Sequence, residues 1–297
     1  VEHGHMVTRM APVSHHRRGG RPFCAPPGTR FGPVEHVVET GSTNADLVFG
    51  AAIVPDGSVL VTDHQTAGRG RLDRRWDAPP GANLLFSVLL RPTWDPDRHP
   101  LATTTLAVAT VEALGTHGVQ AAVKWPNDVL LVGGTAPGKV AGILAELMTG
   151  GPAGGGGPSV GGSGIGSGGT FGAGSVAIVV GMGVNAGWPA LSDDAPPGAT
   201  SLAAAGHRVD RAELLESVLA RFEARLTDLE APDGLERLRR AHLKRSVTVG
   251  GEVRVDMPDG PITGTAVDLA LDGSLLVDSG DGPVAFRAGD VIHLRPA

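Results

Sequence analysis

Apolar residues along this chain recur at two spacings, which alternate from Val34 onward. Six segments carry short apolar runs or an alternation of apolar and polar residues, the pattern of buried or half-buried strands. These predicted strands span 34–40, 58–65, 83–90, 127–132, 139–148 and 176–186. The pattern therefore predicts a sheet whose strands come from most of the chain.

Helical spacing appears between and after these strands. One of the polar residues 42–44 can cap a short helix after the first strand. Pro100 stands at a typical helix start, and the apolar stripe that follows it continues for about four turns. Asp210, with Glu213 three residues later, begins a longer amphipathic helix in the manner of a capping box. A further helix is predicted over 235–244.

After Ser246 the pattern changes to short apolar runs separated by the turn sequences PDG, LDG and GDG. This texture is typical of a small all-β barrel of about fifty residues. The predicted fold class is therefore a mixed α/β domain over 33–246, followed by a small β domain over 247–297.

Two segments lack apolar periodicity. Residues 1–32 are rich in Arg, His, Pro and Gly, and we expect a disordered N-terminal extension there. Residues 150–175 are almost entirely Gly, Ser, Pro and Ala. Because such a segment buries little apolar surface, we expect a flexible insertion at the end of a hairpin, not a domain boundary.

Composition narrows the functional classes. The 297 residues carry a formal net charge of −6, which argues against a general nucleic-acid binder. The apolar runs are far shorter than the roughly 18 residues of a membrane span. A single cysteine, Cys24, excludes an internal disulfide and a Cys-rich metal site. We therefore expect a cytoplasmic protein that binds neither membranes nor nucleic acid.

The sequence TAGRGRLDRRW concentrates four arginines in this acidic chain. Gly68 and Gly70 allow a ligand to approach the backbone, while Arg69 and Arg71 offer planar donor forks for phosphate or carboxylate. Trp76 can stack on a planar ring. An anion that carries a ring, such as a nucleotide, fits this combination, although a solvated basic turn has the same composition.

Other polar clusters lie between apolar runs. KWPNDVLL, which begins at Lys124, places an amide and a carboxylate beside a proline, and Lys139 begins an apolar strand. Both patterns also occur in ordinary turns and strand ends. GTAPGKV is not a P-loop, because its spacing differs and Val140 stands where that loop needs Ser or Thr. GMGVNAG is only a weak match to a dinucleotide-binding loop.

Seven motifs together resemble those of the biotin protein ligases, enzymes that attach biotin to a lysine of biotin-dependent carboxylases. In chain order they are STN, QTAGRGR…W, GANLLFS, KWPNDVLL, GKVAGILAE, GMGVNAG and ATSL. The resemblance runs from about Val34 to Arg295. It implies a catalytic domain related to lipoate ligases and class II aminoacyl-tRNA synthetases, with an SH3-like C-terminal domain.

The resemblance also implies roles for individual residues. Asp128 is expected to assist removal of a proton from the acceptor lysine. The implied catalytic set is Arg69, Arg71, Lys139 and Asp128. The implied biotin-binding set is Ser42, Thr43, Asn44, Gln65, Gly68, Arg69, Gly70, Arg71 and Lys139. The implied ATP- and adenylate-binding set is Arg71, Arg74, Trp76, Lys124, Asn127, Lys139 and Asn185.

The implied reaction uses ATP and biotin as substrates, with Mg²⁺ bound through the ATP phosphates and no certain protein ligand to the metal. The biotin carboxylate, ionised at neutral pH, attacks the α-phosphorus of ATP to give biotinyl-5′-AMP. A lysine of a biotin carboxyl carrier protein or domain then displaces AMP. Concentrated positive charge suits this chemistry because the reacting groups are anionic. The protein would be a monomer or a homodimer.

Two other activities remain open from the sequence. A lipoate or octanoate ligase shares the fold, and a non-catalytic module would bind biotin without transferring it. The STN and GRGR motifs and the C-terminal β domain favour biotin. Some biotin ligases also carry an N-terminal DNA-binding domain, and the short polar segment before Val34 predicts a form without one.

Asp73 departs from the family loop, which usually has a glycine at this position. Aspartate tolerates a positive φ better than most residues. Its charge beside Arg71 and Arg74 is expected to weaken the affinity of the loop for anions.

Overall fold

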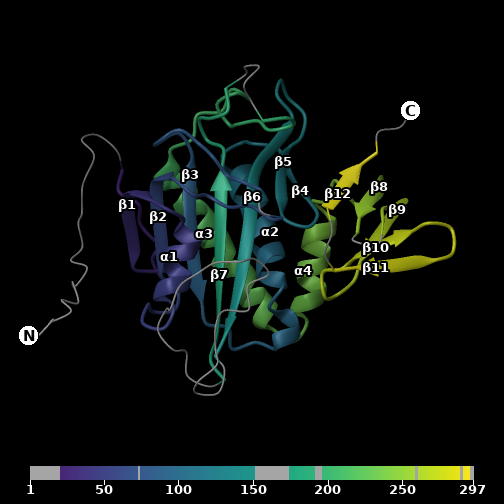
Figure 1. The fold of residues 1–297 in the computed structure, drawn as a ribbon, viewed down its shortest axis with the longest axis horizontal. Coiled ribbons are helices and arrows are strands. Elements are labelled where there is room, and N and C mark those ends of the chain that lie inside the picture. The colour runs from purple at the N-terminus through teal and green to yellow at the C-terminus, as the bar shows by residue number, and fades with distance from the viewer. Residues whose placement is uncertain are drawn as a thin grey trace, which may run out of the picture.

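The computed structural model describes residues 21–72, 74–150, 174–190, 196–257, 260–287 and 290–294. Its larger domain is built on a seven-stranded sheet in the order β1-β2-β3-β7-β6-β5-β4 (Figure 1). The strands are β1 (Val34–Thr40), β2 (Val59–Gln65), β3 (Leu84–Leu90), β4 (Ala121–Lys124), β5 (Asp128–Leu131), β6 (Gly138–Thr149) and β7 (Val176–Val184). β1 and β2 are parallel, and the other neighbouring pairs are antiparallel. The predicted strands are all confirmed, and β4 is a strand that the apolar pattern does not indicate.

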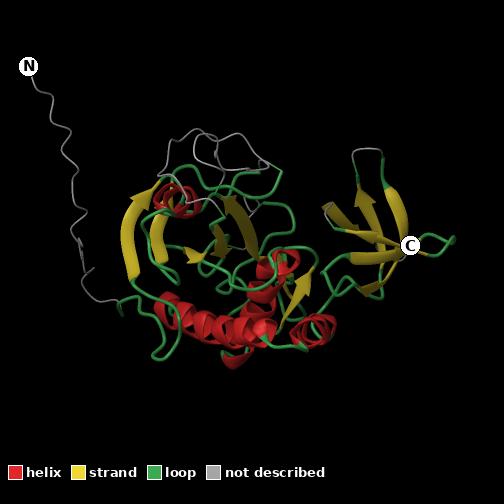
Figure 2. Cartoon of the chain, turned by 90° about the horizontal axis from the view of Figure 1, so that it is seen from below, coloured by secondary structure: helices red, strands yellow, loops and turns green. Residues whose placement is uncertain are grey.

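Helices cover the two faces of this sheet unequally. They are α1 (Thr43–Gly50), α2 (Leu101–Thr116), α3 (Arg211–Glu230) and α4 (Gly234–Leu243), with a 3₁₀ helix η1 (Pro96–Arg98) before α2. α2, α3 and α4 share one face, and α1 lies on the other (Figure 2). In β3, Phe86 and Val88 join the core with α2 and α3, whereas Leu89 joins the core with α1. Because both faces are covered, β3 is apolar at every position except Ser87.

The predicted caps begin two of these helices. Ser42 is the N-cap of α1, and its hydroxyl accepts from the backbone N–H of Ala45. The Asp210 carboxylate accepts from the N–H groups of Ala212 and Glu213 at the start of α3. Both side chains thereby satisfy amide groups that have no partner within the helix.

Residues 21–32 differ from the sequence expectation, because they pack against α3. Phe31 is buried and stacks on Phe222 with ring centroids 5.5 Å apart. The Arg30 guanidinium pairs with Glu223 and with Glu230 over 3.1 and 2.7 Å. The overall composition of residues 1–32 does not indicate this packing, because the contacts with α3 come from a few residues near position 32. The rest of the predicted extension, 1–20, lies outside the described residues.

The C-terminal domain is an antiparallel sheet in the order β11-β10-β9-β8-β12 beside the β4 edge of the larger domain (Figure 1). Its strands are β8 (Glu252–Asp256), β9 (Ile262–Leu269), β10 (Leu275–Asp278), β11 (Pro283–Phe286) and β12 (Asp290–His293). This sheet confirms the β domain predicted after Ser246.

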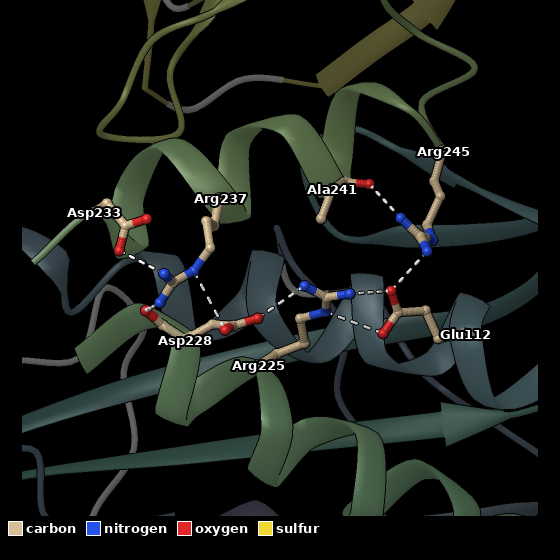
Figure 3. A network of polar contacts seen from close by, with 7 residues as sticks. All are labelled: Glu112, Arg225, Asp228, Asp233, Arg237, Ala241 and Arg245. Carbon is tan, nitrogen blue, oxygen red and sulfur yellow. Dashed lines mark hydrogen bonds and ion pairs between the residues drawn. The ribbon is translucent and has the colours of Figure 1, made fainter. Parts of the chain in front are cut away.

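A network of charged residues ties α2, α3 and α4 together just before the C-terminal domain (Figure 3). Glu112 in α2 pairs with Arg225 in α3 and lies 2.6 Å from the guanidinium of Arg245, which follows α4. Asp228 in α3 joins Arg225 to Arg237 in α4. The chain that enters the C-terminal domain is therefore fixed to the helical layer.

The glycine-rich segment joins β6 to β7, which pair in antiparallel register from Thr149 and Val176 onward. The predicted hairpin is thus confirmed, while residues 151–173 themselves lie outside the described part. Within the described residues, no helix has the length and apolar character required to cross a membrane.

Candidate active site

Thr43 and Asn44 at the start of α1 form a hydrogen-bonded group with Gln65 at the end of β2 and Ser87 in β3. The Thr43 backbone N–H donates to Gln65 Oε1 over 2.9 Å, and its hydroxyl lies 3.1 Å from the same oxygen and 2.7 Å from Ser87 Oγ. Ser87 Oγ donates to Asn44 Oδ1 over 2.7 Å. The structure therefore brings together three predicted biotin-binding residues, while Ser42 caps α1 beside them.

Glu146 extends this group across the sheet to the arginine-rich loop. Asn44 Nδ2 donates to Glu146 Oε2 over 2.8 Å and to the carbonyl of Leu144 over 3.1 Å. Arg69 Nη2 donates to Glu146 Oε1 over 3.0 Å. Glu146 is buried, and its carboxylate joins a residue of α1 to a residue of the loop.

The loop that carries the arginines is closed by its own backbone. The Trp76 N–H donates to the Gly68 carbonyl over 3.0 Å, and the Gly70 N–H donates to the Arg74 carbonyl over 2.6 Å. A side chain at Gly68 would collide with the Trp76 carbonyl, because a Cβ would lie 2.3 Å from that oxygen. Leu72 has a positive φ of 54°. The predicted glycine at the start of this loop is thus required by its close approach to Trp76.

Trp76 lies on a surface made of glycine backbone. A Cβ at Gly142 in β6 would lie 2.9 Å from the indole, and a Cβ at Gly183 in β7 would lie 2.4 Å from it. Lys139 Nζ lies 5.5 Å from the ring centroid, a cation–π distance. The glycines of GKVAGILAE and GMGVNAG thus give the ring room against the sheet, which the sequence alone does not reveal.

Asp128 at the start of β5 and Lys139 at the start of β6 form an ion pair. Lys139 Nζ lies 2.7 Å from Asp128 Oδ1, and both side chains are partly exposed. Beside them, Arg71 Nη1 donates to Asn127 Oδ1 over 3.1 Å, while Asn127 Nδ2 donates to the Ile143 carbonyl over 2.9 Å. Four predicted residues therefore converge from the loop, β5 and β6.

Two other predicted residues are held by the protein itself. Asn185 is buried, and its amide donates to the Thr200 carbonyl over 2.9 Å and accepts from Asn83 over 3.1 Å. Lys124 lies near His293 of the C-terminal domain, where burial first and the Lys124 charge second lower the pKa of the imidazole. Asp73 lies outside the described residues.

Comparison with known proteins places this arrangement in a family. Residues 36–156 match the Biotin/lipoate A/B protein ligase family, and residues 248–294 match the biotin protein ligase C-terminal domain. The biotin–[acetyl-CoA-carboxylase] ligase of Mycobacterium tuberculosis is 34% identical over 90% of this chain and 91% of its own length. The chain belongs to the biotin protein ligase family.

Other similar proteins agree. The biotin–[acetyl-CoA-carboxylase] ligase of Paracoccus denitrificans is 34% identical over 72% of this chain and 81% of its own length. The structure of the Aquifex aeolicus biotin protein ligase in complex with biotin and ATP superposes with a TM-score of 0.69. It is 26% identical and covers 90% of this chain and 100% of its own. The predicted family and fold class, including the SH3-like C-terminal domain, are thus confirmed.

Sequence reasoning about this biotin protein ligase site missed Ser87 and Glu146. Both lie inside the motifs GANLLFS and GKVAGILAE, but each stands within a strand. The signal that could have identified them is a polar side chain within an apolar run, because buried polar groups need a partner. The partners come from α1 and the loop, and only the fold brings them near.

Trp125 connects the same site to the C-terminal domain. Its indole is buried in the core of that domain, and Nε1 donates to the Gly273 carbonyl over 2.9 Å. Its backbone N–H donates to Thr248 Oγ1 over 3.0 Å. Because Asn127 and Asp128 follow within three residues, the position of the C-terminal domain is fixed next to the Asp128–Lys139 pair.

The described residues contain no cluster of three or more His, Cys, Asp or Glu side chains that could enclose a metal ion. The two site carboxylates, Asp128 and Glu146, are each paired with a cation. This donor set fits Mg²⁺ held mainly by the phosphate oxygens of ATP, a common arrangement for this ion.

Proposed function

We propose that this chain is an ATP-dependent biotin protein ligase, which converts biotin to biotinyl-5′-AMP and transfers the biotin to a lysine of a carboxylase carrier domain. The observation that carries the proposal is that Lys139 lies over the glycine-backed Trp76, while Arg71 binds the nearby Asn127. Arg69 binds Glu146, whose other partner, Asn44, belongs to the Thr43–Gln65–Ser87 group. Polar recognition of a ring and positive charge for an anion thus lie side by side.

In the proposed complex, the ureido ring of biotin lies against Thr43 and Gln65, and its carboxylate points toward Lys139. Ser87 holds Thr43 in place through a hydrogen bond, and Asn44 in turn holds Ser87. Ser42 supports them through the helix cap, and Gly68 and Gly70 give the loop room to lie against biotin. Trp76 packs against adenine, and Arg69, Arg71 and Arg74 surround the phosphate.

The first step needs no general base, because biotin reacts as a carboxylate. A carboxylate oxygen attacks the α-phosphorus, the bond to the bridging oxygen of pyrophosphate breaks, and biotinyl-5′-AMP forms. Two anions must approach each other, so Arg69, Arg71 and Lys139 act by neutralising and positioning charge. Mg²⁺, when bound with ATP, supplies further charge neutralisation at the phosphates.

In the second step the acceptor amine attacks the anhydride carbonyl and AMP leaves. A lysine with a pKa of about 10.4 is almost fully protonated at pH 7, so a proton must be removed. We assign this assistance to Asp128, whose carboxylate lies 2.7 Å from Lys139. Lys124, Asn127 and Asn185 act as positioning residues at the nucleotide side, and the loop excludes water from the anhydride.

The acceptor is the carrier domain of an acyl-CoA carboxylase, because the Mycobacterium tuberculosis and Paracoccus denitrificans relatives are named for acetyl-CoA carboxylase. The cytoplasmic location, the choice between monomer and homodimer, and the absence of nucleic-acid binding stay predictions.

Incubation of the purified chain with labelled biotin, ATP, Mg²⁺ and a carrier domain tests the proposal. We expect label on the carrier and release of pyrophosphate, both dependent on ATP. A carrier whose acceptor lysine is replaced by arginine is the matched control and should remain unlabelled.

Lipoate and octanoate serve as parallel substrates in the same assay. Transfer of either one in place of biotin would overturn the proposed substrate. Tight biotin binding without pyrophosphate release would instead indicate a non-catalytic binding module.

A further inference from the structure

We propose that Glu146 is a positioning residue that sets the direction of the hydrogen bonds in the biotin site and holds Arg69 toward the ligand. The proposal rests on the proposed function, because it assigns a role within the same site. Glu146 was not among the residues that the sequence motifs assign to binding or catalysis. Its side chain is only 7% exposed, so its oxygens must be satisfied by neighbouring groups.

The first part of the argument concerns the direction of protons. Both N–H groups of Asn44 are used, one toward Glu146 and one toward the Leu144 carbonyl. Asn44 Oδ1 therefore points to Ser87, whose hydroxyl donates its only proton to that oxygen. Consequently the Thr43 hydroxyl must be the donor toward Ser87 or Gln65, which lie 2.7 and 3.1 Å away.

With these hydrogen-bond directions, the Thr43 hydroxyl has no proton left for a ligand and offers only its oxygen lone pairs. A hydroxyl whose single proton is already donated can only accept from a further partner. The N–H groups of a cyclic urea are donors and match it. Because neither the Glu146 carboxylate nor the Leu144 carbonyl can donate, these two acceptors together fix the orientation of Asn44 and, through Ser87, the acceptor character of Thr43.

The second part concerns Arg69. Both hydrogen bonds from its guanidinium to Glu146 come from Nη2, at 3.0 and 3.3 Å. Its Nε and Nη1 make no hydrogen bond to another side chain among the described residues. Because the guanidinium is planar and rigid, anchoring one nitrogen also directs the others. Glu146 thus leaves donors of Arg69 available for the carboxylate or phosphate of the ligand.

Glu146→Gln tests both parts, because glutamine has the same shape but carries a donor where Asn44 and Arg69 also donate. We expect the biotin dissociation constant measured by calorimetry to rise at least about tenfold, the size of effect typical of a lost charge-assisted hydrogen bond. Glu146→Asp keeps the acceptors with a shorter reach, and we expect its dissociation constant to lie between those of wild type and Glu146→Gln.

Double-mutant cycles separate positioning from general support of the fold. In the Arg69→Ala and Asn44→Ala backgrounds, Glu146→Gln should weaken biotin binding much less than in wild type, because one of its two partners is gone. Fully additive effects in both backgrounds would overturn the proposal. An unchanged dissociation constant for Glu146→Gln would do the same.

Glu112→Gln is the matched control, since Glu112 also pairs with arginine but lies in α2 on the other face of the sheet. It should leave the biotin dissociation constant unchanged. If Glu146→Gln does not fold, Glu146→Asp decides. A wild-type dissociation constant for Glu146→Asp, or fully additive effects when it is combined with Arg69→Ala and with Asn44→Ala, would overturn the proposal. A wild-type chain that binds no biotin would contradict the proposed function instead, before any variant is compared.

Discussion

The indole of Trp76 lies where two glycines leave room for it. Gly142 and Gly183 stand in the neighbouring strands β6 and β7, and their missing side chains let the ring approach the sheet. Lys139 lies over the same ring. The position of the proposed adenine-binding residue therefore depends on residues that have no functional group.

Gly183→Ala should displace Trp76, because the added methyl group would lie 2.4 Å from the indole. Overpacking of this kind costs about 1–3 kcal/mol, so we expect KM for ATP to rise about tenfold. Steady-state pyrophosphate release measures it. Gly115→Ala in α2 is the control, since nothing outside the local helix backbone lies within 4 Å of its added methyl group among the described residues, and KM should not change. Unaltered kinetics in Gly183→Ala would contradict this placement of Trp76.

Asp128→Asn separates the two proposed chemical steps. The substitution keeps the shape of the side chain but removes the carboxylate that lies 2.7 Å from Lys139. We expect transfer from preformed biotinyl-5′-AMP to the carrier to slow by about a hundredfold, the lower end of the range for loss of a general base. The rate should recover partly at higher pH, where more acceptor lysine is neutral. Single-turnover transfer assays check this, and a rate equal to wild type would remove Asp128 from the second step.

Among single residues, the sequence motifs indicated most members of the candidate site but not the residues that hold them in position. Thr43 and Gln65 could be proposed because their motifs resemble those of the biotin protein ligases, and Lys139 also because it stands at the end of an apolar strand. Glu146 and Ser87 could not, because their importance comes from partners far away in the chain. The positions of Asn185 and Lys124 were also unpredictable, since their nearest groups belong to other segments.

Among the elements, α2 is tied to α3 and to the segment after α4 by one carboxylate, that of Glu112. Glu112 accepts from Arg225 Nε over 3.0 Å and pairs with Arg245 over 2.6 Å, and its hydrogen bonds raise the pKa of the Arg225 guanidinium above its ordinary value. The Glu112 side chain is 12% exposed, so water replaces these contacts poorly.

Glu112→Gln should lower the free energy of unfolding by about 2 kcal/mol, because two guanidinium groups would lose their charged partner. Urea denaturation measures the change. Asp233→Asn is the control in the same network (Figure 3), because Asp233 is 63% exposed and, among the described residues, pairs with Arg237 alone. Exposed pairs contribute little, so its loss should stay below about 1 kcal/mol. An equal decrease in the free energy of unfolding for the two variants would contradict a larger contribution from Glu112 than from Asp233.

The elements themselves were largely predictable, because apolar spacing and caps are local. β4 was missed because its sequence, AAVK, has an apolar run of only three residues, and two of them are alanines, which are not typical of strands. Residues 21–32 were assigned to a disordered extension because their composition is polar, whereas Phe31 and Arg30 bind α3 through long-range contacts. Such contacts have no local signature, and the sequence alone could not supply them.

The molecule as a whole is joined through Trp125, which belongs to a site motif but packs in the core of the C-terminal domain. The division into two domains could be predicted from the sequence, but the packing of Trp125 in the C-terminal domain could not. A tryptophan beside a proline gives no indication of which domain buries it. The site and the C-terminal domain are consequently coupled through the backbone between Trp125 and Asp128.

Stability of the whole molecule should fall in mild acid because of His242 in α4, which is 1% exposed. Burial lowers the pKa of this imidazole from 6.5 to about 4. Between these values the unfolded chain binds a proton that the folded protein does not, so stability decreases as pH falls through 6.5 and levels off below about 4. At pH 5 the free energy of unfolding should be about 2 kcal/mol lower than at pH 8.

Urea denaturation at both pH values measures this difference. His242→Gln should lose much of this pH dependence, whereas His207→Gln, at a partly exposed position, should retain it. An identical pH dependence in wild type and His242→Gln would show that other groups govern acid stability.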